Sequence, residues 1–260
     1  ELENPLIVVT GDNGMQFPRA MTTVYDAGTR EPLAIRWGNE IEGGQKVDDL
    51  VSFIDFAPTF LDAAGITPPQ EMNGKSLLPR LRSGNESGDA GFRDKVIMGR
   101  EHHHPLADSL RSRAIRTQRY LYIRNYTPWR TWAGVQHGPF NAQSSMSSRR
   151  VINEKDDFLD VDPSPTKTFM LRPENRRRYH HRCQMAFGPR PPEELYDVKK
   201  DPHQLHNVAD RPELEKVTEK LRKRLQKELK RTGDPRALGR GEAFENYFNQ
   251  EWLRKWKNRS

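Results

Sequence analysis

The chain has 260 residues, of which 34% are hydrophobic and 30% are charged, as expected of a globular protein with a limited core. Its longest apolar run, Leu6–Val9, is far shorter than the ~20 residues of a membrane-spanning helix, so we expect no membrane span. The 43 basic residues exceed the 36 acidic ones and give a net charge of +7, which favours an anionic partner. We do not expect that partner to be nucleic acid, because no helix-turn-helix, zinc-finger or RNA-recognition motif is present.

Much of the basic excess lies in two stretches, Arg172–Arg182 and the helical segment after Pro212. Both can be solvated surfaces, and for the helical segment this is the interpretation we prefer. Cys183 is the only cysteine, so no intrachain disulfide can form. A buried or incidental thiol is favoured there over a reactive or metal-binding one.

The first predicted element is a strand at Leu6–Thr10, followed by the turn Gly11–Gly14. An unbroken run of aliphatic residues is typical of a strand covered on both faces in a parallel or mixed sheet. Ligands in such sheets collect beyond the carboxyl ends of the strands, where Asp12 and Asn13 stand. A second short strand is predicted at Pro32–Trp37.

A helix is predicted over Phe56–Ala64, with Asp55 as its N-cap and Gly65 just beyond its end. The small and polar residues of Ser83–Gly91 predict a loop at a domain boundary. Beyond it, a strand at Lys95–Gly99 and a hairpin within Ser112–Tyr126 are expected.

The stretch Trp129–Pro192 is rich in Pro, Ser, Arg and Trp and is interpreted as a long irregular segment. A final helix follows, for which Asp210 and Glu213 form a capping pattern and Gly233 marks the end. Its apolar residues recur every three or four positions: Leu214, Val217, Leu221, Leu225 and Leu229.

Three segments in the same order carry a family resemblance. They are Ile7–Gly14 with Tyr25–Leu33, then Val51–Leu61 with Gly65-Ile66 and Asn73–Leu78, and last Glu194–Asp197 with Asp201-Pro202 and Asn207–Ala209. Together they resemble the C-terminal portion of type I sulfatases, a branch of the alkaline-phosphatase-like superfamily. Phe17–Ala20, after the Asp-Asn-Gly turn, is most similar to the sulfamidase-like (heparan N-sulfatase-like) branch.

The resemblance implies an α/β fold in two parts. Residues 1–92 would form the closing part of a mixed-sheet alkaline-phosphatase-like domain. Residues 93–260 would form a smaller α+β C-terminal subdomain with an antiparallel sheet and a terminal helix. The implied activity is hydrolysis of sulfate esters or sulfamates on a sulfated glycan, in a periplasmic or extracellular location.

Members of this family use a formylglycine nucleophile and a divalent cation, usually calcium. The resemblance places two metal ligands here, Asp12 and Asn13, and calcium does prefer carboxylate and amide oxygens. The competing interpretation is that Asp12 and Asn13 only build a tight turn.

Two departures from the family pattern matter. The formylglycine motif C/S-x-P-S/A-R is absent, so we assign no catalytic residue to this chain and expect the nucleophile in a missing N-terminal half. The family's sulfate-binding Lys or Arg, nine residues after the metal-binding Asp, is replaced by Met21, and Arg19 is the candidate substitute.

His102 and His103 are candidate substrate-binding residues, because the family often brings a charged or aromatic residue towards the substrate after the preceding strand. Surface exposure is the competing interpretation. Arg113 is one of three nearby arginines, with Arg111 and Arg116, that could add positive charge near a sulfated sugar.

Three functions stay open. The preferred one is a sulfatase whose other half lies upstream or on another chain, so that this chain alone is inactive. The alternatives are an inactive glycan- or partner-binding remnant, and a phosphonate or phosphate monoester hydrolase of the same superfamily.

Overall fold

The computed structural model describes residues 4–38, 40–83, 92–101, 110–127, 158 and 160–244. The chain divides into two compact units, of which the first comprises Glu1–Asp12, Glu31–Val96 and Arg116–Gln118 and the second comprises the rest. The predicted boundary at 92/93 stays a prediction, and residues 13–30 belong to the C-terminal unit. Among the described helices, none combines the length and apolar character needed to cross a membrane.

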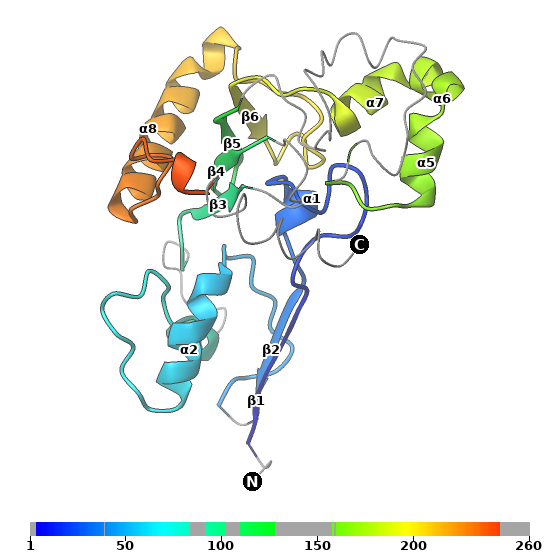
Figure 1. Cartoon of the computed structure of the whole chain (residues 1–260). Helices are drawn as coiled ribbons and strands as arrows, with labels where there is room; N and C mark the ends of the chain where they lie inside the picture. The colour runs from blue at the N-terminus through cyan, green and yellow to red at the C-terminus, as the bar shows by residue number, and fades with distance from the viewer. Residues whose placement is uncertain are drawn as a thin grey trace, which may run out of the picture. The chain divides into compact units, whose positions relative to one another are not determined.

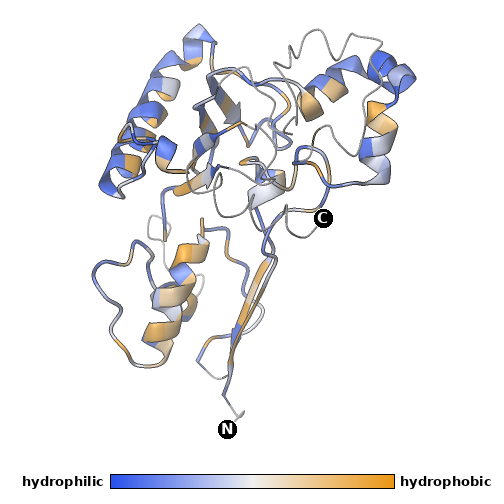
Figure 2. Cartoon of the chain, in the orientation of Figure 1, coloured by the Kyte–Doolittle hydropathy of each residue, from blue (hydrophilic) through white to orange (hydrophobic). Residues whose placement is uncertain are grey.

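The first unit contains an antiparallel ribbon of two strands, β1 (Leu6–Thr10) and β2 (Leu33–Trp37), both of which were predicted (Figure 1). Their residues are mostly apolar (Figure 2). Ile7 and Val9 are nevertheless 47% and 62% exposed, so the described residues do not supply the expected cover on both faces. An apolar run predicts burial, but it does not identify the polypeptide that supplies the cover.

The same unit carries a short 3-10 helix η1 (Phe53–Asp55), the predicted helix α2 (Phe56–Ala63) and helix α3 (Leu78–Ser83). Asp55 is the N-cap residue of α2 as expected, but its side chain makes no capping hydrogen bond to α2. Ser52 is the N-cap of η1, and Asp55 is the third residue of its capping box. The 3-10 turn starts the helical segment three residues before α2, so the side-chain capping hydrogen bonds lie at the start of η1 instead.

Asp55 is fully buried and holds the loop after α2 in place. Its carboxylate accepts hydrogen bonds from the backbone N–H groups of Ser52 (2.9 Å) and Lys75 (2.8 Å) and pairs with Arg93. A Cβ at Gly74 would lie 1.8 Å from the carbonyl oxygen of Ile54, so only glycine fits this close approach.

The second unit is organised by a four-stranded sheet with the order β3 (Val96–Arg100), β4 (Ser112–Arg116), β5 (Tyr120–Asn125) and β6 (Glu193–Asp197). The predicted hairpin is confirmed as β4 and β5. Strands β5 and β6 are antiparallel, with Tyr122 opposite Leu195 and Ile123 opposite Glu194. Neighbouring residues on each strand therefore point to opposite faces of the sheet.

One face of the sheet is covered by helix α8 (Glu215–Arg231), which contributes Leu221, Leu225 and Leu229 to a core with Tyr122 (Figure 1). The spacing of these leucines predicted this helix. The predicted cap at Asp210 was wrong, because a 3-10 turn, η3 (Pro212–Leu214), precedes α8 and its N-cap is Leu214.

The opposite face packs against residues 13–30, which include the short helix α1 (Asp26–Thr29). Val24 and Tyr25 from this segment join Leu121 and Ile123 in one apolar cluster. The sheet therefore lies between the C-terminal helix and a segment from near the N-terminus.

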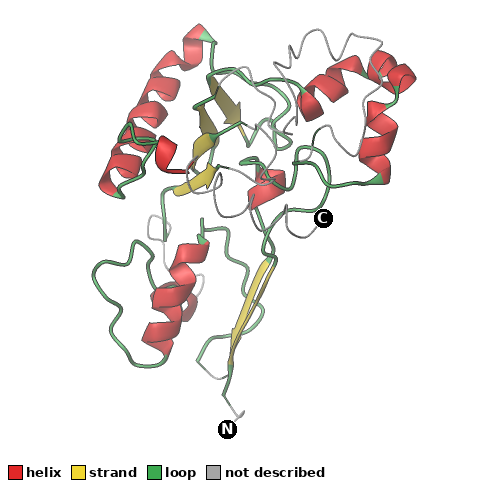
Figure 3. Cartoon of the chain, viewed as in Figure 1, coloured by secondary structure: helices red, strands yellow, loops and turns green. Residues whose placement is uncertain are grey.

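Three helices, α5 (Pro165–Leu171), α6 (Pro173–Arg178) and α7 (His180–Phe187), lie where the sequence predicted an irregular segment (Figure 3). That prediction was wrong for these residues, because helices of six to eight residues are too short to show a clear apolar period. Prolines at the starts of α5 and α6 and Ser164, which caps α5, favour helix initiation instead.

The helices enclose an apolar cluster in which the rings of Phe158 and Phe187 are 4.9 Å apart. Cys183 is buried in this cluster, and burial raises the pKa of its thiol. The structural interpretation of this cysteine is confirmed.

The contribution of ion pairs on the sheet to stability can be tested at Glu193 of β6. Hydrogen bonds from Arg222, with the Tyr122 hydroxyl and Arg124 adding to them, lower the pKa of Glu193 from 4.5 to about 2. Because the folded state favours the ionised form, Glu193 stabilises the fold above about pH 4.5 and loses this effect between pH 4.5 and 2.

We predict that Glu193→Gln lowers the free energy of unfolding by about 1 kcal/mol at pH 7. The difference from the wild-type chain should shrink as the pH falls towards 2. Urea titrations at several pH values measure it, with Glu174→Gln on exposed α6 as the control. A deficit that does not change with pH would show that the ionised carboxylate is not what stabilises this face.

Candidate functional site

The predicted metal ligands stand at the carboxyl end of β1. The side chains of Asp12 and Asn13 are both exposed. Asn13 donates a hydrogen bond from Nδ2 to the carbonyl oxygen of Gly14 at 2.9 Å, which leaves its Oδ1 atom available as a ligand. Among the described residues, no hydrogen bond or ion pair engages the Asp12 carboxylate, so both residues still offer an oxygen to a cation.

These donors fit calcium in kind but not in number. Calcium takes about six to eight oxygen ligands, including carboxylates and amide oxygens. Within the described part of the chain, no group of three or more His, Cys, Asp and Glu residues could hold a metal. Asp12 and Asn13 would therefore supply only part of a coordination shell, and their assignment as ligands stays a prediction.

The turn after Asn13 is shaped by two glycines that no other residue can replace. A Cβ at Gly14 would lie 2.3 Å from the carbonyl oxygen of Ala27, and one at Gly28 would lie 2.1 Å from that of Ala20. The chain therefore folds back on itself between residues 14 and 28 with backbone against backbone. This contact explains why glycine follows Asn13 and why glycine occurs again at residue 28.

Arg19, the candidate substitute for the family's basic residue, has a left-handed backbone with φ of 68°. Its guanidinium donates to the carbonyl oxygens of His203 (3.1 Å) and Gln204 and lies 4.0 Å from the centroid of the Tyr25 ring. These contacts hold the residues 13–30 segment to the loop after β6. The structure thus places Arg19 in a bridging position, and its role in substrate binding stays a prediction.

Met21 is half-buried, and its backbone N–H donates to the carbonyl oxygen of Met15 at 3.1 Å. Its thioether carries no charge, so it cannot attract sulfate electrostatically.

A buried polar network lies beneath this segment, centred on Glu194 of β6. The hydroxyl groups of Tyr25 and Tyr196 both donate to Oε2 of Glu194, at 2.7 and 2.6 Å, and Asn125 Nδ2 donates to Oε1 at 2.9 Å. The guanidinium of Arg190 donates to the Tyr25 hydroxyl at 2.9 Å. Burial raises the pKa values of both tyrosines, so they stay protonated and act as donors.

Tyr25, Glu194 and Tyr196 lie in the segments that resemble the family, but no role was predicted for them. These residues come from two separate segments that resemble the family, which indicated that the two segments lie together in the fold. No local periodicity could show that a single carboxylate joins them.

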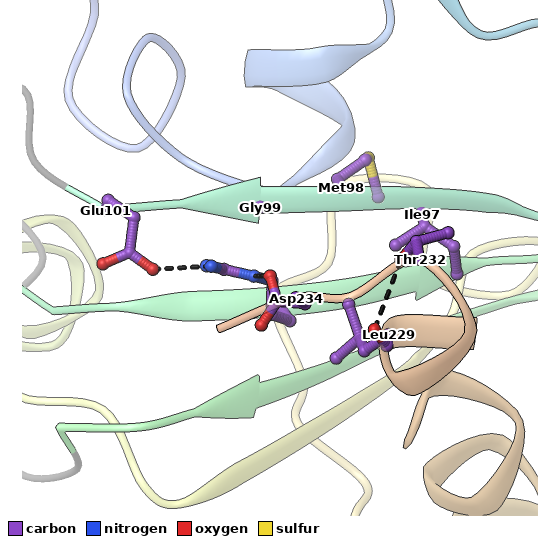
Figure 4. A pocket seen from close by; sticks show the side chains of 8 residues that line it. Ile97, Met98, Gly99, Glu101, Leu229, Thr232 and Asp234 are labelled. Atoms are coloured by element: carbon purple, nitrogen blue, oxygen red, sulfur yellow. Dashed lines mark hydrogen bonds and ion pairs between the residues drawn. The ribbon is translucent and has the colours of Figure 1, made fainter. Parts of the chain in front are cut away.

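A cavity of about 370 Å³ opens beside β3 and the end of α8, lined in part by Met98, Leu229 and Thr232 (Figure 4). Arg113 crosses it and pairs with Glu101 at 2.6 Å and Asp234 at 2.7 Å. Its charge is therefore compensated within the protein, which argues against the predicted contribution of Arg113 to a sulfate site. His102 and His103 lie outside the described residues.

The glycine contact behind Asn13 can be tested directly. We predict that Gly14→Ala lowers the free energy of unfolding by about 1–3 kcal/mol, because the new Cβ would overlap the Ala27 carbonyl and backbone would have to move. Gly43→Ala is the matched control, since its Cβ would meet nothing within 4 Å, and it should be neutral. Equal denaturation midpoints for the two variants would contradict the close approach.

Comparison with known proteins gives concordant matches. The model of the family described as "N-sulphoglucosamine sulphohydrolase, C-terminal" matches residues 17–146, half of the chain. An ulvan-active sulfatase of Formosa agariphila is 29% identical over 253 residues, covering 95% of this chain and 37% of the relative. The human N-sulphoglucosamine sulphohydrolase is 27% identical over 250 residues, covering 90% of this chain and 43% of the relative.

Solved structures share the fold. A protein solved with its substrate D-glucosamine-2-N,6-O-disulfate matches with a TM-score of 0.57 and 24% identity, covering 88% of this chain and 35% of that one. A 2-O GAG sulfatase matches with a TM-score of 0.56 and 21% identity, covering 88% and 37%. These neighbours, together with the helices and antiparallel sheets, confirm the predicted fold class. The chain belongs to the family of N-sulphoglucosamine sulphohydrolase C-terminal regions, in the sulfamidase-like branch of the sulfatases.

Proposed function

We propose that this chain is the C-terminal portion of a sulfatase that hydrolyses sulfate ester or sulfamate bonds on a sulfated glycan. The observation that carries the proposal is the exposed Asp12–Asn13 pair, which precedes a turn where only glycine fits, in a chain of this family. Relatives named for activity on ulvan and on N-sulphoglucosamine support a sulfated sugar as the substrate class.

Asp12 and Asn13 would hold a divalent cation, most favourably calcium, through a carboxylate and an amide oxygen. When bound, the cation supplies positive charge that neutralises the sulfate group and the charge developing on it during hydrolysis. The chain's own contribution is to orient the two oxygens. The turn at Gly14 restrains Asn13, and the hydrogen bond from Nδ2 to the Gly14 carbonyl directs its amide.

The nucleophile, a formylglycine, would lie outside this chain. The chain covers 37% and 43% of the two relatives, and it contains no C/S-x-P-S/A-R motif. The exposed apolar residues Ile7 and Val9 of β1 are consistent with cover by another part of the enzyme. We therefore expect this chain to be inactive alone. From the family resemblance, we expect the complete enzyme in the periplasm or outside the cell.

Calcium-dependent sulfate release tests this function. We expect no turnover of a sulfated glucosamine by this chain alone, and turnover when the complementary sulfatase portion is present. In the complete enzyme, Asp12→Ala should lower kcat/KM by about 10³-fold or more, because it removes a charged ligand. Asn13→Ala should lower it less, by about 100-fold, because a neutral ligand is lost.

Folding controls accompany these measurements. Both side chains are exposed, so neither variant should shift the melting temperature. Full activity of Asp12→Ala, or activity that survives removal of divalent cations, would contradict the metal assignment. Turnover of phosphonate monoesters in preference to sulfate esters would favour the other hydrolase class, and a complete enzyme without turnover would favour a binding remnant.

A further inference from the structure

Helices α6 and α7 and the residue before them present a group of exposed basic side chains. Between Arg172 and Arg182 the only acidic residue is Glu174. The exposed basic side chains in this interval, here called the basic face, are Arg172, Arg177, Arg178, His180, His181 and Arg182. Figure 2 shows hydrophilic residues predominating on α6. This stretch of the sequence was noted for its charge, and neither the fold nor the proposed catalysis uses that charge.

Within the described part of the chain, the exposed arginines of α6 and α7 have no carboxylate partner. Among the described residues, no ion pair engages Arg177, Arg178 or Arg182. Helix α8 is also basic, but several of its cations have carboxylate partners, including Arg222 with Glu193 at 2.5 Å. Lys223 with Glu219 and Arg231 with Glu228 are two more such pairs, at 2.5 and 3.0 Å.

Unpaired arginines are suited to oxyanions. A guanidinium presents its N–H donors in a planar fork that matches two oxygens of a phosphate or sulfate, and it is less strongly hydrated than an ammonium group. Several of them close together attract a polyanion more than a single anion, because each additional charge on one chain binds with no further loss of overall translational freedom.

Two aromatic rings adjoin the basic face. Phe169 at the end of α5 is 47% exposed, and its ring lies 5.9 Å from that of Tyr179. The guanidinium of Arg178 lies 5.4 Å from the Tyr179 ring. Aromatic faces carry partial negative charge and attract the polarised C–H groups on the face of a sugar ring. The exposed Phe169 ring, next to Tyr179 and Arg178, therefore fits an anionic carbohydrate.

We propose that the basic face, together with Phe169 and Tyr179, binds a linear sulfated polysaccharide. The arginines would contact its sulfate groups, and the rings would pack against its sugars. The inference rests on the proposed function in one respect. The choice of a sulfated polysaccharide over another polyanion is supported by relatives named for ulvan and for a GAG.

Binding of this chain to immobilised ulvan and heparin tests the proposal, and surface plasmon resonance gives the affinity. We expect Arg177→Gln/Arg178→Gln to weaken binding about 10-fold without a change in melting temperature, and Phe169→Ala to weaken it about 3-fold. The matched control is Lys220→Gln/Lys227→Gln, which removes the same charge from exposed positions on α8 and should weaken binding less than about 2-fold. Desulfated heparin, which keeps only its carboxylates, should bind more weakly than heparin.

Equal losses in the arginine and lysine pairs would show attraction by net charge alone and overturn the proposal. Binding to duplex DNA or to phosphatidylserine vesicles as tight as to heparin, with the same dependence on the arginines, would also overturn it. Turnover of a sulfated monosaccharide by the complete enzyme separates a failure of this inference from a failure of the proposed function. Loss of polymer binding with turnover intact refutes this inference alone, whereas polymer binding without any turnover refutes only the proposed hydrolysis.

Discussion

The carboxylate of Glu194 joins three stretches of chain that are far apart in the sequence. It is 2% exposed and accepts hydrogen bonds from Tyr25, Tyr196 and Asn125, and Tyr25 stands 169 residues away from it. Leaving a buried charged group without its donors costs several kcal/mol, so these contacts strongly favour one arrangement. The path of residues 13–30 across the sheet therefore depends on this one charge and on Arg190 beside it.

The candidate site depends on that path. Tyr25 is held by Glu194, helix α1 begins at the next residue, and Ala27 and Gly28 come close to Gly14. The position of Asn13 thus follows from a hydrogen-bond network in the C-terminal unit rather than from β1 alone. Arg19 strengthens the same arrangement by bonding to the loop after β6. We infer that the C-terminal unit contributes to the proposed catalysis by positioning Asn13.

Local patterns in the sequence predicted several strands and helices of the fold. The aliphatic run of β1, the leucine spacing of α8 and the alternation in β4 and β5 are signals carried by neighbouring residues, and the structure contains all of these elements. The short helices α5–α7 were missed, because Ser164 and the prolines are weak signals without an apolar period. The roles of Asp55 and Glu194 could not be predicted, since their partners come from distant segments.

The central claim is that Asp12 and Asn13 hold the cation of a sulfatase. A crystal structure of the complete enzyme grown with calcium tests it most directly. The account predicts an ion within about 2.3–2.6 Å of an Asp12 carboxylate oxygen and of Asn13 Oδ1, with further oxygens supplied from outside this chain. Calcium bound elsewhere, with the Asp12 carboxylate bonded instead to a protein donor, would contradict it.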